Sequence, residues 1–425
     1  MLDVKFIREN PELVRQGLIN KNSQDIVDEI INLYEKRRTL IAKTEELKAK
    51  KNKVSAEIPK LKKAGKDTSN IFAEMKQVGD EISQLDGSLK EVEDNIENIL
   101  RSTPNIAHES VPVGKSAEEN VEVRRWLPEG FSFDNDFKVL DHVELGKKLK
   151  LLDFERGTKI AGSGFPLYTA KGATLERALI NFMLDVHLQK HNYTEIMPPV
   201  LVNRDSMKGT GQIPKMEEDM YFIEKDGLYP IPTAEVPITN IHREEILSEK
   251  DLPIKYVGYS PCFRREAGSY GKDSKGFLRV HQFNKVEMVK FSFPENSYEE
   301  LELMVKDAED ILQALKIPYR ILMLCTGDLS FSAAKCYDIE TWSPAENKWL
   351  EASSCSNFES FQARRANIRF KREANKKTEF VHTLNGSGLA TSRLMVSLLE
   401  NYQTPEGKVI VPKVLQKYTG FEILD

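Results

Sequence analysis

The sequence predicts an α+β protein in which an N-terminal antiparallel coiled-coil hairpin precedes an antiparallel sheet flanked by helices. Apolar residues first alternate spacings of three and four between residues 30 and 99. Beyond residue 139, short runs rich in β-branched and aromatic residues alternate with longer helical patterns. The 425-residue chain is 40% hydrophobic, enough for two or so domains with sizeable cores. We therefore expect an N-terminal domain at residues 1–104, a connector at 105–138 and a larger domain at 139–425.

The first long helix follows from a heptad pattern in which every d position is apolar. Its a and d residues are Ile30, Leu33, Arg37, Leu40, Thr44, Leu47, Lys51, Val54, Ile58 and Leu61. Because proline lacks the N–H that an interior helical residue donates, we expect the helix to kink or stop near Pro59.

The second long helix has a heptad seam that is apolar throughout. Its members are Ile71, Met75, Val78, Ile82, Leu85, Leu89, Val92, Ile96 and Ile99. A short polar segment at residues 63–69, with Gly65 inside it, separates the two helices, so they should fold back as an antiparallel hairpin. At 1.5 Å per residue, helices of about 35 residues would reach roughly 50 Å.

Charge is distributed unequally between the two helices of this arm. The first is rich in basic residues, namely Lys36, Arg37, Arg38, Lys43, Lys48, Lys50, Lys51, Lys53, Lys60, Lys62 and Lys63, with Lys66 in the turn. The second carries Asp80, Glu81, Asp86, Glu91, Glu93, Asp94 and Glu97. Two interpretations remain open: the charges pair across the hairpin, or the basic side chains form a positive ridge for phosphates. The net charge of −5 excludes neither.

The segment after the arm follows a break in the heptad at residues 102–104 and contains two prolines and two glycines, as a connector would. Beyond it, strands are expected at residues 255–259 and 286–291 and helices at 174–189 and 297–315.

The expected location is the cytosol. No apolar run approaches the roughly 20 residues that span a bilayer, and the N-terminus lacks the pattern of a secretion signal. The cysteines Cys262, Cys325, Cys336 and Cys355 are scattered, so we expect free thiols instead of a zinc site or disulfides.

Three segments that could bind anions follow one another in the larger domain. Residues 264–266 read Arg-Arg-Glu, residues 279–283 read Arg-Val-His-Gln-Phe, and a glycine-rich run at 385–388 leads to Arg393. Arginine presents a planar fork that can bridge carboxylate and phosphate oxygens at once. This order indicates a site that brings two anions together.

The order of these motifs resembles motifs 2 and 3 of the class II aminoacyl-tRNA synthetases, and most closely the bacterial-type seryl-tRNA synthetase family. Further segments similar to that family are residues 209–212, 231–237, 285–287, 337–340, 353–358 and 361–365. The resemblance runs from Met1 to near the C-terminus. It implies a class II synthetase antiparallel sheet and an enzyme that activates L-serine with ATP.

Serine would then be transferred to the 3′ end of tRNA(Ser), whose long variable arm the coiled coil would grip. Whether tRNA(Sec) is also a substrate stays open, as does the alternative of a non-catalytic tRNA-binding or regulatory protein that kept the fold. The latter predicts a lost motif arginine, whereas Arg264 and Arg393 are both present. No general base is required, since an α-carboxyl with a pKa of about 3.3 is ionised at neutral pH.

The resemblance also assigns ATP and Mg²⁺ to specific residues. Arg264 and Arg393 would be catalytic, Arg264 bridging the serine carboxylate and the α-phosphate and Arg393 binding the γ-phosphate. Glu351 and Ser354 would hold Mg²⁺, a hard cation that prefers oxygen ligands. The ATP-binding set comprises Arg264, Arg265, Glu266, Val280, His281, Gln282, Phe283, Glu351, Ala352, Ser353, Ser354 and Arg393.

The serine-binding set implied by the resemblance is polar. It comprises Thr233, Ala234, Glu235, Arg264, Glu287, Asn385 and Ser387. A site built to bind a hydroxyl can reject the analogue without it by about 10⁴ to 10⁵, which would exclude alanine. Threonine could be excluded only sterically.

Residues 174–189 and 193–199 resemble motif 1, which implies a homodimer. The chain departs from the family pattern at two places. Gly164 stands where the family usually has arginine, so no substrate role is expected for that loop. The run from Gly388 to Arg393 lacks the third glycine that many class II members have, which makes the local backbone uncertain but not the arginine.

Overall fold

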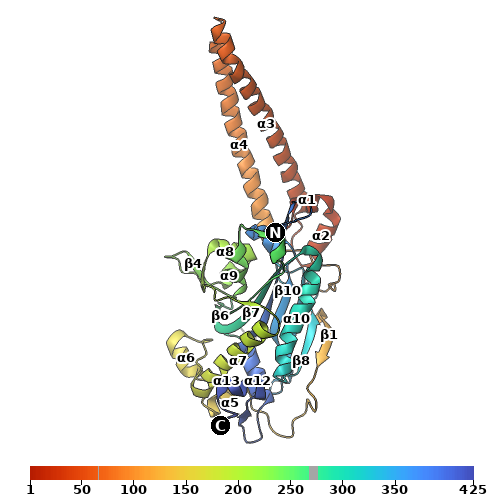
Figure 1. Ribbon diagram of the computed structural model, residues 1–425, viewed down its shortest axis with the longest axis vertical. Coiled ribbons are helices and arrows are strands. Elements are labelled where there is room, and N and C mark those ends of the chain that lie inside the picture. Colours follow the sequence, from red (N-terminus) through yellow and green to blue (C-terminus); the bar gives the residue numbers. More distant parts are fainter. Residues whose placement is uncertain (66, 268–275) are drawn as a thin grey trace. The chain divides into compact units, whose positions relative to one another are not determined.

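The computed structural model describes residues 1–65, 67–267 and 276–425 (Figure 1). Their contacts divide into two compact units, Leu2–Pro104 and Asn105–Asp425, the second including Met1. Each unit is considered by itself below. Lys66, expected in the turn of the arm, lies outside the described residues.

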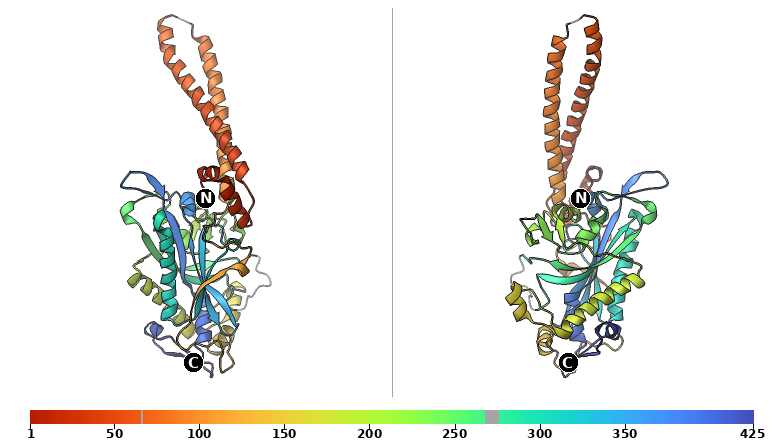
Figure 2. Two further views of the ribbon diagram at one scale, coloured as in Figure 1. Left: turned by 90° about the vertical axis from the view of Figure 1, so that its right-hand side faces the viewer. Right: turned by 60° about the vertical axis from the view of Figure 1, so that its left-hand side comes forward.

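The N-terminal unit confirms the predicted hairpin. Two short helices, α1 (Val4–Glu9) and α2 (Pro11–Asn20), precede the long helices α3 (Val27–Lys63) and α4 (Ser69–Ser102). The long helices run side by side in opposite directions (Figure 2). The seam buries the expected apolar residues of α4, including Met75, Val78, Ile82, Val92 and Ile96.

Helix α3 does not stop at Pro59 but continues to Lys63. The proline removes the hydrogen bond to the carbonyl of Ser55, and Ser55 is exposed, so water can satisfy that carbonyl. The helical pattern on both sides of the proline therefore persists.

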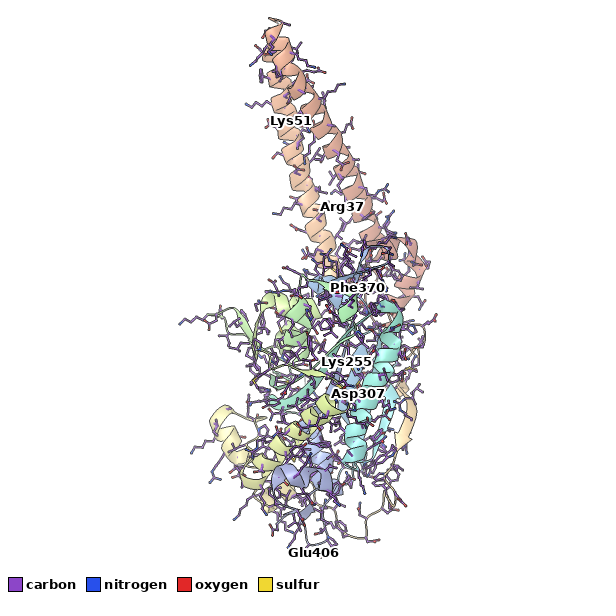
Figure 3. All side chains as sticks on the ribbon, in the orientation of Figure 1. Arg37, Lys51, Lys255, Asp307, Phe370 and Glu406 are labelled. Carbon is purple, nitrogen blue, oxygen red and sulfur yellow. The ribbon has the colours of Figure 1, made fainter. Side chains whose placement is uncertain are left out.

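Part of the charge on the arm is paired across the hairpin. Ion pairs join Arg37 to Glu93 at 2.8 Å, Lys48 to Asp86 at 3.1 Å and Lys50 to Glu74 at 2.7 Å. Arg37 and Lys51 both project from α3 (Figure 3). Other lysines of α3 form no ion pair with any residue described in the structure: Lys36, Lys43, Lys51, Lys53, Lys60 and Lys63.

The second unit is built on an eight-stranded sheet in the order β1-β8-β9-β10-β13-β7-β6-β2. Its strands are β1 (Val121–Trp126), β8 (Tyr319–Met323), β9 (Lys335–Ser343), β10 (Lys348–Asn357), β13 (His382–Ala390), β7 (Gln282–Ser292), β6 (Ile254–Phe263) and β2 (Thr194–Glu195). All neighbours are antiparallel except β2 and β6. The predicted antiparallel sheet is thereby confirmed. The stretch 105–138, expected as a connector, contributes its edge strand β1.

Three helices cover one face of this sheet: α7 (Ala170–Gln189), α10 (Ser297–Ala314) and α12 (Thr391–Asn401) (Figures 1 and 2). Strand β7 shows how the two faces differ. Val286 and Met288 are fully buried in the core that these helices share with the sheet. Lys285 and Glu287 alternate with them and therefore point to the opposite face. That face carries the polar site.

Smaller elements surround the sheet. The remaining helices are α5 (His142–Lys148), α6 (Phe154–Ala161), α8 (Arg204–Thr210), α9 (Glu235–Thr239), α11 (Phe361–Ala366) and α13 (Lys413–Thr419), with short 3₁₀ turns η1 (Ala117–Glu119), η2 (Glu217–Asp219), η3 (Asn240–His242), η4 (Glu249–Asp251) and η5 (Pro294–Asn296). The remaining strands are β3 (Leu201–Asn203), β4 (Leu228–Pro230), β5 (Ile246–Ser248), β11 (Arg369–Lys371), β12 (Thr378–Phe380), β14 (Val409–Ile410) and β15 (Ile423–Leu424). Within the described ranges, no helix combines the length and apolar character that a membrane span requires.

Candidate active site

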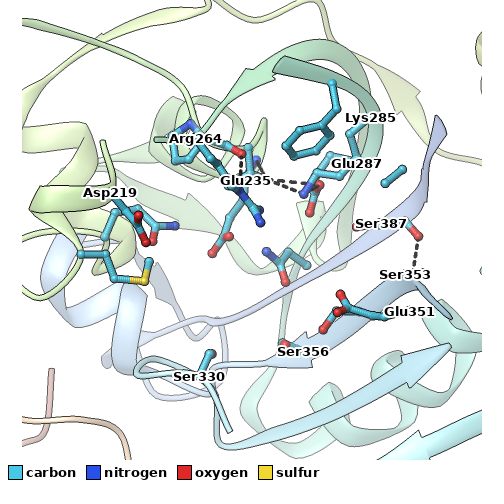
Figure 4. Close-up of a pocket in the computed structure, with 18 of the residues that line it drawn as sticks. Asp219, Glu235, Arg264, Lys285, Glu287, Ser330, Glu351, Ser353, Ser356 and Ser387 are labelled. Carbon is cyan, nitrogen blue, oxygen red and sulfur yellow. Dashed lines mark hydrogen bonds and ion pairs between the residues drawn. The ribbon is translucent and has the colours of Figure 1, made fainter. Parts of the chain in front are cut away.

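A polar cavity of about 410 Å³ lies over the central strands β7, β13 and β10 (Figure 4). Most residues predicted for the site line it: Thr233, Glu235, Arg264, Glu266, Val280, Phe283, Glu287, Glu351, Ala352, Ser353, Ser354, Asn385, Ser387 and Arg393. The structure thus brings together segments that lie far apart in the sequence.

Four predicted residues do not line the cavity. Ala234 is buried in the small core behind it. The backbone of Arg265 donates to the carbonyl of Asp219. The ring of His281 lies 3.0 Å from the carbonyl oxygen of Arg264, and Gln282 is exposed at the start of β7.

A register shift in β10 brings the two predicted Mg²⁺ ligands onto one face of the sheet. Glu351 pairs with Glu340 of β9, and Ser354 pairs with Asp338. Three steps on β10 therefore match two steps on β9, so one extra residue is inserted between the ligands. Without that residue the side chains of Glu351 and Ser354 would point to opposite faces.

Ser354 and its neighbours form a buried polar cluster beside the cavity. The hydroxyl of Ser354 lies 3.1 Å from the thiol of Cys336. Burial, followed by the negative charge of Glu351, raises the pKa of Asp338 well above its ordinary value. Burial and Glu351 thus disfavour the ionised form of Asp338, and a cation bound nearby would favour it. All four cysteines are buried free thiols.

Strands β7 and β13 place three of the residues predicted to bind serine next to one another. Ser387 lies directly opposite Glu287 across the ladder, and Asn385 lies two residues away on the same face. Glu287 is almost fully buried and accepts an ion pair from Lys285 at 2.5 Å. The cavity thus contains a buried carboxylate that is paired with a lysine of the same strand.

The hydroxyl of Thr233 has both acceptor positions filled. It accepts from Lys285 Nζ at 2.8 Å and from the backbone N–H of Glu235 at 3.2 Å, and it donates to Glu287 Oε2 at 3.3 Å. A hydroxyl has one donor and two acceptor positions. Thr233 therefore cannot accept from a bound ammonium group unless one of these contacts is broken.

Glu235 is the second carboxylate of this group and the first residue of α9. Burial, then the charge of Glu287, raises the pKa of Glu235 to about 7, while Gln362, Lys285 and Arg264 act in the opposite direction. Its charge therefore depends on the neighbours that surround it.

Arg264 extends from the end of β6 across the ring of Phe283 on β7. Its guanidinium carbon lies 5.2 Å from the ring centroid, and its Nε donates to the carbonyl of Pro232 at 3.3 Å. The backbone N–H of Arg264 also donates to the carbonyl of His281. Cation–π stacking holds the flat guanidinium along the cavity wall with most of its donors still available.

Glu266 follows two residues later in a left-handed backbone conformation, with φ of 51°. Arg279 Nη1 lies 2.9 Å from its carboxylate. This ion pair links the two described ends of the motif on either side of residues 268–275, which lie outside the described part of the chain.

Arg393 stands on the other side of the cavity, in the first turn of α12. Within the run from Gly388 to Arg393, Leu389 has φ of 115°, a conformation that favours glycine. The strain coincides with a register shift between Ser387 and Ala390 of β13. Leu389 is fully buried, so packing holds it in this conformation.

The sequence assigned no role to Lys285 or Gln362, although both fall within the motifs noted above. Lys285 contacts two predicted serine-binding residues, and the period-2 alternation of β7 could have revealed that it shares a face with Glu287. Gln362 lies on α11, and nothing local in the sequence indicates its contact with Glu235.

The antiparallel sheet, with one arginine on each side of a polar cavity, agrees with the class II aminoacyl-tRNA synthetase architecture expected from the motifs. The family model "tRNA synthetase class II core domain (G, H, P, S and T)" matches residues 220–402, and "Seryl-tRNA synthetase N-terminal domain" matches residues 1–107.

Two curated relatives and two solved structures resemble the whole chain. The serine–tRNA ligase of Chloroherpeton thalassium is 60% identical over 100% of both chains, and that of Chlorobaculum parvum is 58% identical over 100% of both. Seryl-tRNA synthetase from Pyrococcus horikoshii complexed with ATP has a TM-score of 0.94 and 42% identity, covering 100% of this chain and 99% of that one. Cytoplasmic serine–tRNA ligase from Naegleria fowleri in complex with AMP has a TM-score of 0.89 and 33% identity, with the same coverage. The chain belongs to the seryl-tRNA synthetase family.

Proposed function

We propose that this chain activates L-serine with ATP to form seryl-adenylate and then transfers serine to the 3′ end of tRNA(Ser). The observation that carries the proposal is that one cavity is lined by two buried carboxylates, Glu235 and Glu287. The same cavity is lined by Arg264 and Arg393. The ATP and AMP complexes of the two structural relatives support a nucleotide in the same fold.

We assign Arg264 to the reacting centre, where it would contact both reacting groups. The serine carboxylate attacks the α-phosphorus, a bond forms between them, and pyrophosphate leaves. The guanidinium of Arg264 can donate to a carboxylate oxygen and an α-phosphate oxygen at the same time. These contacts reduce the repulsion between the two anions. The stacking on Phe283 supports this role, because it fixes the plane of the donors before substrate binds.

ATP binding is assigned to the remaining motif residues. Phe283 offers an aromatic face for the adenine ring, Glu266 an acceptor for its amino group, and Arg393 a cation for the γ-phosphate. We assign His281 and Gln282 to this set only through their backbone, and Arg265 through its charge, because their side chains do not line the cavity.

Mg²⁺ is the proposed metal, held by the oxygens of Glu351 and Ser354. Their shared face supports the assignment. Among the described residues, no cluster of three or more His, Cys, Asp or Glu side chains could hold a metal, which suits an ion that takes most of its ligands from phosphates and water. When bound, the metal would neutralise charge on the ATP phosphates.

Serine recognition is assigned to Thr233, Ala234, Glu235, Glu287, Asn385 and Ser387, with Arg264 on the carboxylate and Ala234 contributing only its backbone position. Glu235 and Glu287 supply negative charge for the ammonium group. The unpaired polar groups that alanine would leave in this cavity would oppose its binding.

The arm is the proposed RNA-binding element within an N-terminal domain at residues 1–104. Six of its lysines are free of ion pairs with any described residue, which supports a phosphate-binding ridge for the long variable arm of tRNA(Ser). Lys48 and Lys50 instead pair with acidic residues across the hairpin. Residues 139–425 then form the catalytic domain.

We also propose a cytosolic homodimer formed through α7 and β2. A second cavity of about 440 Å³ is lined by residues of these two elements. Met197 also lines it and is 88% exposed. A large exposed apolar side chain beside a hollow supports burial against a second copy.

Pyrophosphate exchange tests the proposal most cheaply. The purified chain, supplied with ATP, Mg²⁺ and labelled pyrophosphate, should exchange label into ATP when L-serine is added, and not with alanine, glycine or threonine at equal concentration. Exchange driven by another amino acid, or no exchange at all, would contradict the proposed function.

A further inference from the structure

Gln362 lies outside the cavity but holds one of the residues that line it. It is the second residue of α11, almost fully buried, and its Nε2 donates to Glu235 Oε1 at 2.6 Å. The same nitrogen lies 3.2 Å from the carbonyl oxygen of Thr210. The Gln362 amide nitrogen thus donates both to the carboxylate of Glu235 and to a main-chain carbonyl.

The orientation of this amide is fixed from both ends. Thr383 of β13 donates its hydroxyl to Gln362 Oε1 at 2.8 Å. If the amide were reversed, its oxygen would face the carboxylate of Glu235 and the carbonyl of Thr210, both of which are acceptors. The chain Thr383, Gln362, Glu235 therefore has one direction of hydrogen bonding.

The other oxygen of Glu235 remains available. Among the described residues, no donor forms a hydrogen bond with Glu235 Oε2, while Glu235 lines the cavity. Thr233, by contrast, has both acceptor positions filled. The acceptors best placed for a substrate ammonium group are thus carboxylate oxygens.

We propose that Gln362 is a positioning residue for serine recognition: its amide holds one oxygen of Glu235 so that the other, ionised, receives the ammonium group of the amino acid. The inference rests on the proposed function of the cavity. Gln362 itself does not touch substrate, because it does not line the cavity.

The charge balance around Glu235 supports this role. Its pKa is raised to about 7 by burial and by Glu287. Gln362, Lys285 and Arg264 are the neighbours that favour the charged form. At neutral pH the group is close to half ionised, so the loss of one donor changes the ionised fraction substantially. Removing the Gln362 amide raises the pKa further and moves serine binding to higher pH.

The test is the pH dependence of the serine KM, measured by pyrophosphate exchange with the full chain between pH 6 and 8.5. In the unchanged protein, 1/KM for serine should rise through a midpoint near 7. Gln362→Met should move the midpoint up by about one pH unit and raise the serine KM at pH 7 about fivefold, with the KM for ATP changed by less than about twofold.

Two further variants separate positioning from packing. Gln362→Glu keeps the size of the side chain but places a second carboxyl against Glu235, so its midpoint should also rise. Gln403→Met removes another buried glutamine whose amide donates to main-chain carbonyls, those of Leu140 and Glu400, away from the cavity. It should leave the midpoint unchanged.

An unchanged midpoint in both Gln362 variants would overturn the inference, even if the serine KM rose equally at every pH. Absence of serine-dependent exchange in the unchanged protein would instead refute the proposed function, so the two failures are distinguishable. If Gln362→Met does not fold, the shift in Gln362→Glu decides the question alone.

Discussion

Arg393 forms an ion pair with Glu351 at the wall of the cavity. Its Nη1 lies 3.1 Å from the Oε2 of Glu351 and 2.7 Å from the main-chain oxygen of the same residue. The side chains are 31% and 47% exposed, so solvent screens the ion pair and it can exchange for other charged partners at little cost. The residue proposed for the γ-phosphate and the residue proposed for Mg²⁺ thus form an ion pair with each other.

Glu351→Gln should increase the Mg²⁺ concentration required for half-maximal pyrophosphate exchange by at least about tenfold, because a charged ligand is replaced by a neutral one. A titration of exchange against Mg²⁺ at fixed ATP measures it. Glu346→Gln, which removes a carboxylate from the turn of the same hairpin, should leave the titration unchanged. Equal Mg²⁺ requirements in the Glu351 variant and the unchanged protein would exclude Glu351 as a ligand.

Arg264→Ala should reduce serine-dependent exchange by about 10² to 10³, the loss typical of deleting one preorganised donor from a transition state. The thermal midpoint should change little, since among the described residues the side chain makes one hydrogen bond, to Pro232. Arg156→Ala, a change at an exposed arginine of α6, is the control. Near-normal exchange without Arg264 would remove it from the reacting centre.

Glu287→Gln should raise the serine KM by about 30-fold or more, because losing one member of a buried charge pair, here the pair proposed with the serine ammonium group, costs about 2–5 kcal/mol. The KM for ATP should stay within about threefold. Glu300→Gln is a matched control, since Glu300 pairs with the buried Lys290 of the same strand but does not line the cavity. Equal losses for serine and ATP would indicate general damage to the site.

Deleting residues 30–99 and joining the ends with a short linker should leave serine activation nearly intact and severely impair tRNA charging. The arm packs its own heptad core and contributes no residue to the cavity. Charging by the intact chain should also fall steeply as salt rises, because phosphate contacts release counterions. If the shortened chain charged tRNA as efficiently at moderate salt, the arm would have only a structural role.

Local periodicity was sufficient to predict the arm, parts of strands β6 and β7, and helices α7 and α10. Heptads determine which residues of α3 and α4 face each other, so the seam could be read without knowing the rest of the fold. Strand β1 was different. It lies at the edge of the sheet with five of its six residues exposed, and without a buried face it has no alternating apolar pattern to detect.

The residues around the site could be predicted in part. Ordered motifs identified fourteen of the residues that line the cavity, several of them on strands β7, β10 and β13 of the central sheet. The roles of Lys285 and Gln362 depend on hydrogen bonds made only after folding. Gln362 is 127 residues from Glu235, and no spacing rule relates a residue of α11 to the first residue of α9.

Aminoacylation itself tests the central claim most directly. The full chain, incubated with ATP, Mg²⁺, labelled L-serine and a transcript of tRNA(Ser), should attach label to the 3′ end of the RNA, and a transcript without the long variable arm should be charged far less. The result that would contradict the account is an intact, folded protein that attaches no serine to tRNA(Ser), or that charges the same transcript with another amino acid.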